Sequence, residues 1–142
     1  MARIVLTNVE VKLGAVDLSD HVASVTLSST YDVLETTAFA GGNVPAAAKT
    51  RIAGLADNSV TLEFHQDFAA GEVEATVYPL LGGTVAMTVK PNTSAPDAVD
   101  NPRYDFTALV SEWTPLNGAV GELATASVTW PITGAITKDV TP

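Results

Sequence analysis

The chain contains two histidines, and each has an aspartate close by in the sequence. His21 directly follows Asp20, and His65 precedes Asp67 by two residues. A histidine beside a carboxylate occurs in acid–base pairs and in metal sites. A metal site needs three or more converging ligands, and the sequence has neither an H-x-x-x-H nor an H-x-H spacing. The sequence therefore predicts no metal site and no cofactor, and both histidines are expected at the edge or on the polar face of a strand.

Motifs for nucleophilic or nucleotide chemistry are missing from the sequence. No G-x-S-x-G occurs, and the serines follow strand alternation. The glycine pairs at 41–42 and 82–83 lack the spacing and the lysine of a phosphate-binding loop. Glu72 and Glu74 are two residues apart, so they do not share a helix face. We therefore expect no catalytic residues and no enzymatic activity.

The elements that would position any site are mostly strands. Residues 60–65 and 125–130 alternate apolar and polar side chains, which is the period of a half-buried strand. Thr125, Ser127 and Thr129 occupy one face of the second stretch. Weaker versions of this pattern recur, and the sequence predicts about six strands, at residues 9–13, 23–28, 60–65, 84–90, 104–113 and 123–130.

One stretch, residues 67–81, has a helical period instead. Val73, Val77 and Leu80 fall at i, i+4 and i+7, and Pro79 should end or distort the helix. Six strands and one short helix predict a mainly β fold, an antiparallel sandwich or barrel with the helix against it. The 142 residues show no repeat or linker, so residues 1–142 are expected to form a single domain.

The long segment after the second predicted strand is unusual for a loop. Residues 31–53 are apolar, small and broken by glycine, and residues 54–58 predict a turn before the next strand. The segment has nothing local on which to pack, which favours a contact with another protein. Residues 131–142 are expected to form an extended, weakly held tail.

Composition and charge exclude several classes of partner. Charged residues make up only 16% of the chain, and the net charge is −9. Such a chain should avoid phosphate backbones and anionic lipid. There are no cysteines, no apolar run approaches the length of a membrane span, and the first residues do not resemble a signal peptide. We expect no membrane contact, and a cytoplasmic protein or one exported within an assembly.

The chain resembles the major tail tube proteins of long-tailed (siphovirus-type) bacteriophages, most closely those of phages of actinobacteria. The resemblance runs from about Val9 to Lys138. Its pieces come in the order of the family: VKLGAVDLSDHVASVTLSSTYDVLETTAF, RIAGLADNSVTLEFHQDF, VYPLLGGTVAMTVKP and SVTWPITGAITK. No single piece is a chemical motif, and the specificity comes from the ordered set.

The resemblance implies a structural virion protein that assembles itself. Family members form hexameric rings with an inner β-barrel, and the rings stack into a tube through which genomic DNA passes without specific binding. The implied partners are further copies of the chain, a tape-measure protein and tail-tip or terminator proteins. The implied location is the virion tail, assembled in the host bacterial cytoplasm. Two alternatives stay open: a phage capsid-decoration or tail-terminator protein that does not polymerise, and a ligand-binding or enzymatic β-sandwich.

The resemblance also gives roles to particular residues. The segment at 31–53 would reach a neighbouring subunit through its apolar side chains, its flexible glycines and its two bases. Acids that line the lumen would repel DNA phosphates, with Glu63 as the first candidate; outer-surface solvation is the alternative for each acid. The candidate interface residues are Phe39, Gly41, Gly42, Val44, Lys49 and Arg51, and the candidate lumen-facing acids are Glu63, Asp105 and Glu112.

Overall fold

The computed structural model describes residues 3–41, 45 and 47–142 of the chain. The described residues form eight strands and three short helices. The strands are β1 (Glu10–Leu13), β2 (Val16–Asp17), β3 (Val22–Glu35), β4 (Arg51–His65), β5 (Thr84–Lys90), β6 (Arg103–Leu109), β7 (Thr125–Ile132) and β8 (Thr137–Asp139). The helices are η1 (Ser19–His21), α1 (Val73–Val77) and η2 (Tyr78–Leu80).

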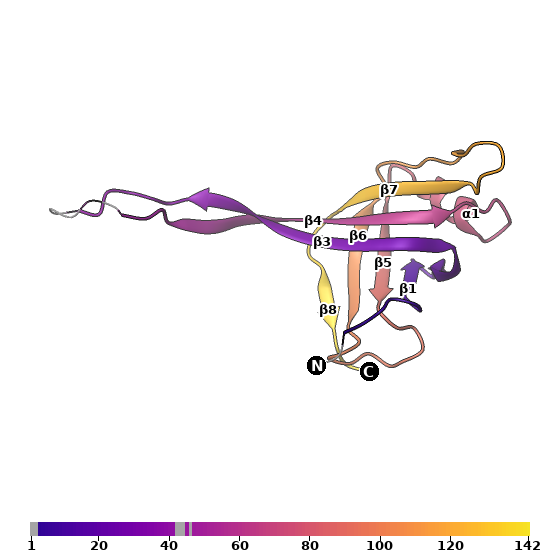
Figure 1. Cartoon of the computed structure of the whole chain (residues 1–142), viewed down its shortest axis with the longest axis horizontal. Helices are drawn as coiled ribbons and strands as arrows, with labels where there is room; N and C mark the ends of the chain where they lie inside the picture. The colour runs from indigo at the N-terminus through magenta and orange to yellow at the C-terminus, as the bar shows by residue number, and fades with distance from the viewer. Residues whose placement is uncertain (1–2, 42–44, 46) are drawn as a thin grey trace.

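All strand pairs are antiparallel, and they follow the order β2-β1-β5-β6-β7-β4-β3, with β8 added to β6. The sheet folds over at the junction of β6 and β7, where one residue pair, Ala108 with Ile132, joins two layers. β3, β4 and β7 form one layer, and β1, β5, β6 and β8 run across it (Figure 1). This arrangement confirms the predicted antiparallel β architecture with one short helix.

The core lies between the two layers and is built from the alternating apolar positions. Even-numbered residues of β7, and of β4 from Asn58 onward, point inward, including Leu62, Phe64 and Trp130, none of which is exposed to solvent. The Phe64 ring lies 5.6 Å from that of Trp113, edge to face, and 6.3 Å from that of Trp130. The Trp130 Nε1–H donates to the carbonyl of Glu112 at 2.9 Å, so this buried polar atom is satisfied.

The helical segment is shorter than the sequence pattern predicts. α1 begins at Val73, after a turn in which Gly71 has a φ of +76°. Val73 and Val77 are fully buried, as the helical spacing predicts. Pro79 lies in η2, where the chain leaves the α-helical path. No helix in the described ranges is long and apolar enough to cross a membrane.

The turn predicted at residues 54–58 is wrong, because these residues lie inside β4: residues 56–58 pair with β3, and residues 54–55 lie at an irregularity in the pairing. Asn58, whose polarity favours a turn, is only 5% exposed. Its side chain accepts a hydrogen bond from the Ser29 hydroxyl and donates one to the Gly134 carbonyl at 3.1 Å. A Cβ added to Gly54 would meet the Cβ of Asp32 at 3.1 Å, so glycine permits the close approach of the strands. Long-range pairing therefore overrides the local turn preference.

The C-terminal residues are extended, and they are held by ion pairs as well as by strand pairing. Arg103 on β6 contacts Asp139 on β8 at 2.8 Å, Asp97 at 2.8 Å and Asp105 at 3.0 Å. The hydrogen bond with Asp105, followed by its charge, raises the pKa of Arg103. Hydrogen bonds from the Thr141 hydroxyl and N–H lower the pKa of Asp139. The charged side chains of β6, β8 and the loop before β6 are thus largely paired with one another.

The alternation of β4 predicts opposite outcomes for two adjacent truncations. Leu62→Ala removes a fully buried side chain and should lower the free energy of unfolding by about 2–5 kcal/mol. Thr61→Ala, on the exposed face, should change it by no more than about 0.5 kcal/mol. Urea denaturation followed by tryptophan fluorescence measures both values. Equal losses for the two variants would show that the assigned register is incorrect.

Candidate assembly surfaces

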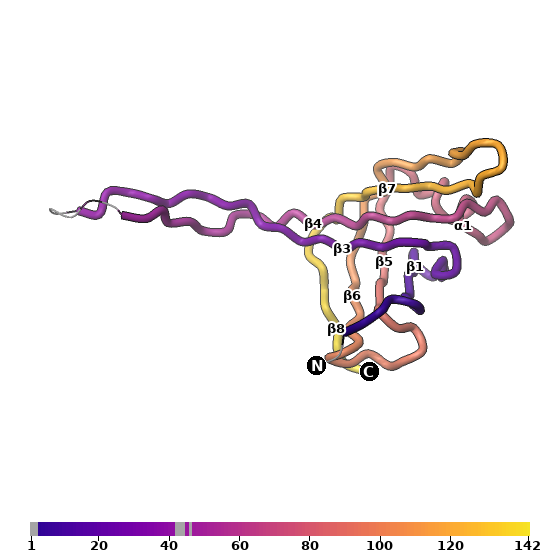
Figure 2. The backbone as a smooth tube through the Cα atoms, viewed as in Figure 1, coloured from indigo at the N-terminus to yellow at the C-terminus, as the bar shows by residue number. Residues whose placement is uncertain are grey.

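The distal halves of β3 and β4 leave the sandwich as a long two-stranded ribbon (Figures 1 and 2). We call residues 31–57 the arm; residues 42–44 and 46 of it lie outside the described ranges. Strand pairing continues to Glu35 opposite Arg51, and beyond it the Thr36 N–H donates to the Thr50 carbonyl at 2.8 Å. Both ends of the segment that the sequence predicts as a loop, residues 31–35 and 51–53, are therefore strand. In the figures the arm projects away from the side of the sandwich that carries α1.

The arm exposes large apolar side chains along its length. An isolated two-stranded hairpin is at best marginally stable in water, and contiguous apolar surface favours a protein contact. Leu55 is 80% exposed and Phe39 fully exposed, so neither has a packing partner within the described part of its own subunit. The exposed apolar residues of the arm are Tyr31, Val33, Leu34, Phe39, Ile52 and Leu55.

The predicted interface residues lie on the arm, and their local environments differ. Gly41 has a φ of +78°, a conformation that favours glycine. Lys49 Nζ lies 3.8 Å from Glu35 Oε1 in an exposed pair within the arm, a type of contact that contributes little stability. Arg51 is exposed at the start of β4. Two further predicted residues, Gly42 and Val44, lie outside the described residues.

The outward face of the β3-β4-β7 layer is lined by hydroxyl groups. The Thr61 and Thr129 hydroxyl oxygens are 3.2 Å apart, in hydrogen-bond contact across β4 and β7. Glu63, half-buried, supplies the carboxylate of this face. We call this surface the hydroxyl face. Its aligned rows are Ser24, Glu63 and Ser127; Thr26, Thr61 and Thr129; and Ser28, Ser59 and Pro131.

The three candidate acids do not lie on one surface. Glu63 pairs with Ser127 of β7, and Glu112 approaches the opposite edge of β7, where its Oε1 accepts the Thr129 N–H at 2.7 Å. Asp105 lies on β6, in the other layer, where it accepts the Thr88 hydroxyl at 2.8 Å as well as the Arg103 contact. The structure therefore brings Glu63 and Glu112 to the same strand and separates Asp105 from them.

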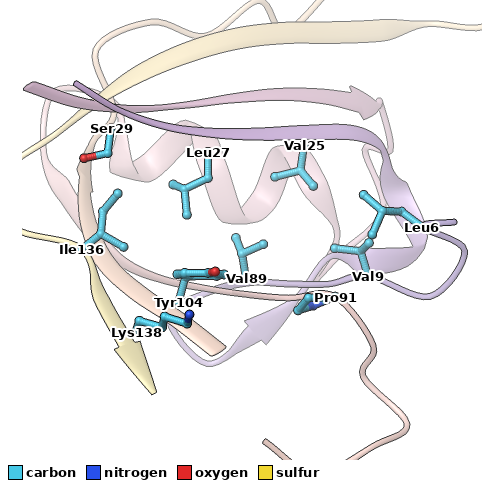
Figure 3. A pocket seen from close by; sticks show the side chains of 10 residues that line it. All are labelled: Leu6, Val9, Val25, Leu27, Ser29, Val89, Pro91, Tyr104, Ile136 and Lys138. Carbon is cyan, nitrogen blue, oxygen red and sulfur yellow. The ribbon is translucent and has the colours of Figure 1, made fainter. Parts of the chain in front are cut away.

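β3 forms the long edge of the sheet, because the described strands pair only with its β4 side; the short strand β2 ends the sheet at the other side. An unpaired edge of this length is a template for another chain. Beside this edge, an apolar groove of about 410 Å³ opens between the two layers (Figure 3). In the figure, side chains of β3 point toward those of the crossing layer. The groove is lined mainly by Leu6, Val9, Val25, Leu27, Tyr104 and Ile136.

Comparison with solved structures identifies the fold of the chain, whereas comparison with curated sequences finds no match. No protein-family model matches the chain, and no curated protein sequence matches it. A chain of the sheath–tube complex of an extracellular contractile injection system (PVC), in the extended state, is 13% identical with a TM-score of 0.70. The match covers 98% of this chain and 93% of that one. The chain has a tail-tube-like fold.

A second solved structure shares this tail-tube-like fold. It is a chain from the tail of an empty GTA particle, determined with C6 symmetry, at 12% identity and a TM-score of 0.60. The match covers 92% of both chains. Both likenesses extend over nearly the whole chain, so the fold includes both layers of the sandwich.

If the arm contributes nothing to its own subunit's core, its apolar residues are dispensable for folding. Phe39→Ser and Leu55→Ser should each change the free energy of unfolding of the isolated subunit by no more than about 0.5 kcal/mol. Val128→Ser, at a buried position of β7, serves as the contrast and should be strongly destabilising. Chemical denaturation at low protein concentration measures all three. A loss above about 1.5 kcal/mol at either arm position would place that side chain in the subunit's own core.

Proposed function

We propose that this chain is a tail tube subunit, which self-assembles into hexameric rings that stack into a hollow conduit for DNA. The observation that carries the proposal is the apolar arm, whose large side chains have no packing partner among the described residues of their own subunit, in a chain with a tail-tube-like fold. The sixfold symmetry of the GTA tail supports a hexamer. The sequence resemblance to tail tube proteins of actinobacterial phages supports the same role, which is structural and not enzymatic.

Two unsatisfied surfaces of the subunit give self-association its physical basis. The arm buries its apolar residues on a neighbouring copy, and the free edge of β3 pairs with a strand of an adjacent subunit. These surfaces differ from one another, so the contact is heterologous, and heterologous contacts generate closed rings or open filaments. A stacked-ring tube combines the two, because each ring is closed and the stack of rings is open-ended.

The hydroxyl face is the best candidate for the lumen wall. It is polar and carries little charge apart from Glu63, so water covers it and a passing phosphate backbone finds no cation. A negative wall repels phosphates, which lets DNA slide without adhering. Glu63 is therefore our first lumen-facing acid and Glu112 our second. Asp105 is the weakest of the three, because its charge is compensated by Arg103.

The partners follow from this role. The subunit meets further copies of itself, and a tube of defined length requires a tape-measure protein together with tail-tip and terminator proteins. The location is then the virion tail, after assembly in the cytoplasm of the host bacterium. A capsid-decoration or tail-terminator role is the second candidate. A terminator would also use the free edge of β3, yet it would stop at one ring.

Electron microscopy of the purified protein separates these roles. The wild-type chain should form rings or tubes in negative stain, at high concentration or with a tail-tip initiator. Replacing residues 40–48 by a short Gly-Ser linker should leave the subunit folded and abolish polymerisation, because the arm tip is lost. Circular dichroism and thermal unfolding establish that the variant is folded.

Each outcome has a distinct meaning. A strict monomer at all concentrations, with and without an initiator, would overturn the proposal, and a single ring that never stacks would favour the terminator role. A matched control shortens the exposed turn at residues 118–122, on the other side of the sandwich, and should still polymerise.

The lumen assignment predicts an effect of charge reversal on DNA retention. Glu63→Lys places one cation per subunit on the hydroxyl face and should raise the retention of short duplex DNA by assembled tubes at least tenfold in low salt. Glu122→Lys makes the same charge change at an exposed loop position and should raise it much less. Co-sedimentation of DNA with the tubes, repeated at several salt concentrations, measures the difference. Equal retention in both variants would place Glu63 outside the lumen.

A further inference from the structure

His21 lies among three carboxylates that come from separate parts of the chain. Its Nδ1 is 2.8 Å from Asp20 Oδ1 and 3.5 Å from Glu72 Oε2, and its Nε2 is 2.9 Å from Asp67 Oδ2. η1 supplies His21 and Asp20, the segment after β4 supplies Asp67, and Glu72 directly precedes α1. The imidazole is largely shielded, with 18% of the side chain exposed. The fold thus assembles a cluster that the sequence spacing does not indicate.

Both ring nitrogens of His21 face carboxylate oxygens, although a neutral imidazole carries only one N–H. Asp67 is fixed by the Ala69 N–H, which donates to its Oδ1 at 2.9 Å, and its other oxygen accepts the Nε2–H of His21. When the ring is protonated, its Nδ1–H donates to Asp20 beside Glu72, and a divalent cation that displaces this proton would lie between the same three groups. In the described part of the chain, no lysine or arginine forms an ion pair with any of these three carboxylates.

We propose that His21 Nδ1, Asp20 and Glu72 form a binding site for a divalent cation of the zinc class, with Asp67 as the positioning residue. One donor atom from each of the three ligands lies within 4.8 Å of the others. With bonds of about 2.0–2.1 Å, the donors of a tetrahedral zinc site lie about 3.3 Å apart. The distances from Nδ1 to the two carboxylates, 2.8 and 3.5 Å, bracket this spacing. Water completes the coordination on the side where Asp20 is exposed.

The ligand set selects among cations. A ring nitrogen with two carboxylates suits zinc and its transition-metal neighbours, whereas magnesium prefers oxygen ligands alone. The contact of Asp67 with Nε2–H is the arrangement in which a carboxylate orients a metal-binding histidine and raises its basicity. The same carboxylates raise the pKa of His21, with the hydrogen bond to Asp20 as the largest cause, and the Ala69 N–H is the main cause of the lowered pKa of Asp67. The first shift is that of an imidazole among carboxylates, and the second is that of a carboxylate that accepts hydrogen bonds.

Calorimetry and thermal unfolding of the untagged full chain, freed of metal by a chelator, test the site with zinc chloride. One Zn²⁺ should bind per chain and raise the unfolding temperature, while magnesium chloride at the same concentration should do neither. His21→Gln and Glu72→Gln should weaken zinc binding at least tenfold. Asp67→Asn should weaken it by about 10–100-fold. His65→Gln, at the other histidine, is the matched control and should bind as the wild type does.

NMR of the histidine rings keeps the test valid if a variant fails to fold. In the wild-type chain, zinc should shift the ring signals of His21 and leave those of His65 in place. Three outcomes would overturn the proposal: no zinc binding, zinc binding that survives His21→Gln, or an equal response to magnesium, which would indicate an acidic surface alone. All these measurements use the unassembled subunit, so they do not depend on the proposed tube function.

Discussion

The structure depends on one long antiparallel pairing, that of β3 with β4. These strands have 14 and 15 residues, and they pair over almost their whole length. The sandwich is wide enough to cover only part of this ribbon. Where β4 also pairs with β7, its alternate residues are buried; beyond Asn58 it has β3 alone, and both strands are exposed. The same pairing thus supplies Val60, Leu62 and Phe64 to the core at one end and carries apolar side chains into solvent at the other.

The two crossing layers differ in how their outer surfaces carry charge. On the β5-β6-β8 layer, acids are matched with bases: Lys90 lies 3.0 Å from Asp97, which also contacts Arg103, so the loop before β6 is tied to both neighbouring strands. The hydroxyl face of the other layer has hydroxyl pairs and Glu63 instead. Because burial of a charge is costly unless the charge is paired, the paired layer suits packing, and the hydroxyl face suits contact with water.

The end of the sandwich that carries α1 is organised around His21. The turn before it is fixed by Asp17, which accepts the Ser19 N–H at 2.9 Å. His21 then joins the start of β3 to the end of β4 and the start of α1. β3 therefore carries a polar cluster at one end and the apolar arm at the other, and the two ends present different chemistry to any partner.

Local periodicity by itself determined which face of each of these strands and of the helix is buried. The alternation at residues 60–65 and 125–130 and the helical spacing of Val73 and Val77 depend only on neighbours in the chain, and the structure buries the residues that these patterns select. Tertiary structure decided what lies opposite each strand. Pairing with β3 turned residues 54–58 from a predicted turn into strand, because cross-strand hydrogen bonds and the satisfied side chain of Asn58 outweigh a local preference. Pairing likewise brought Asp67 to His21, 46 residues away, and no spacing rule reports a contact that only the fold creates.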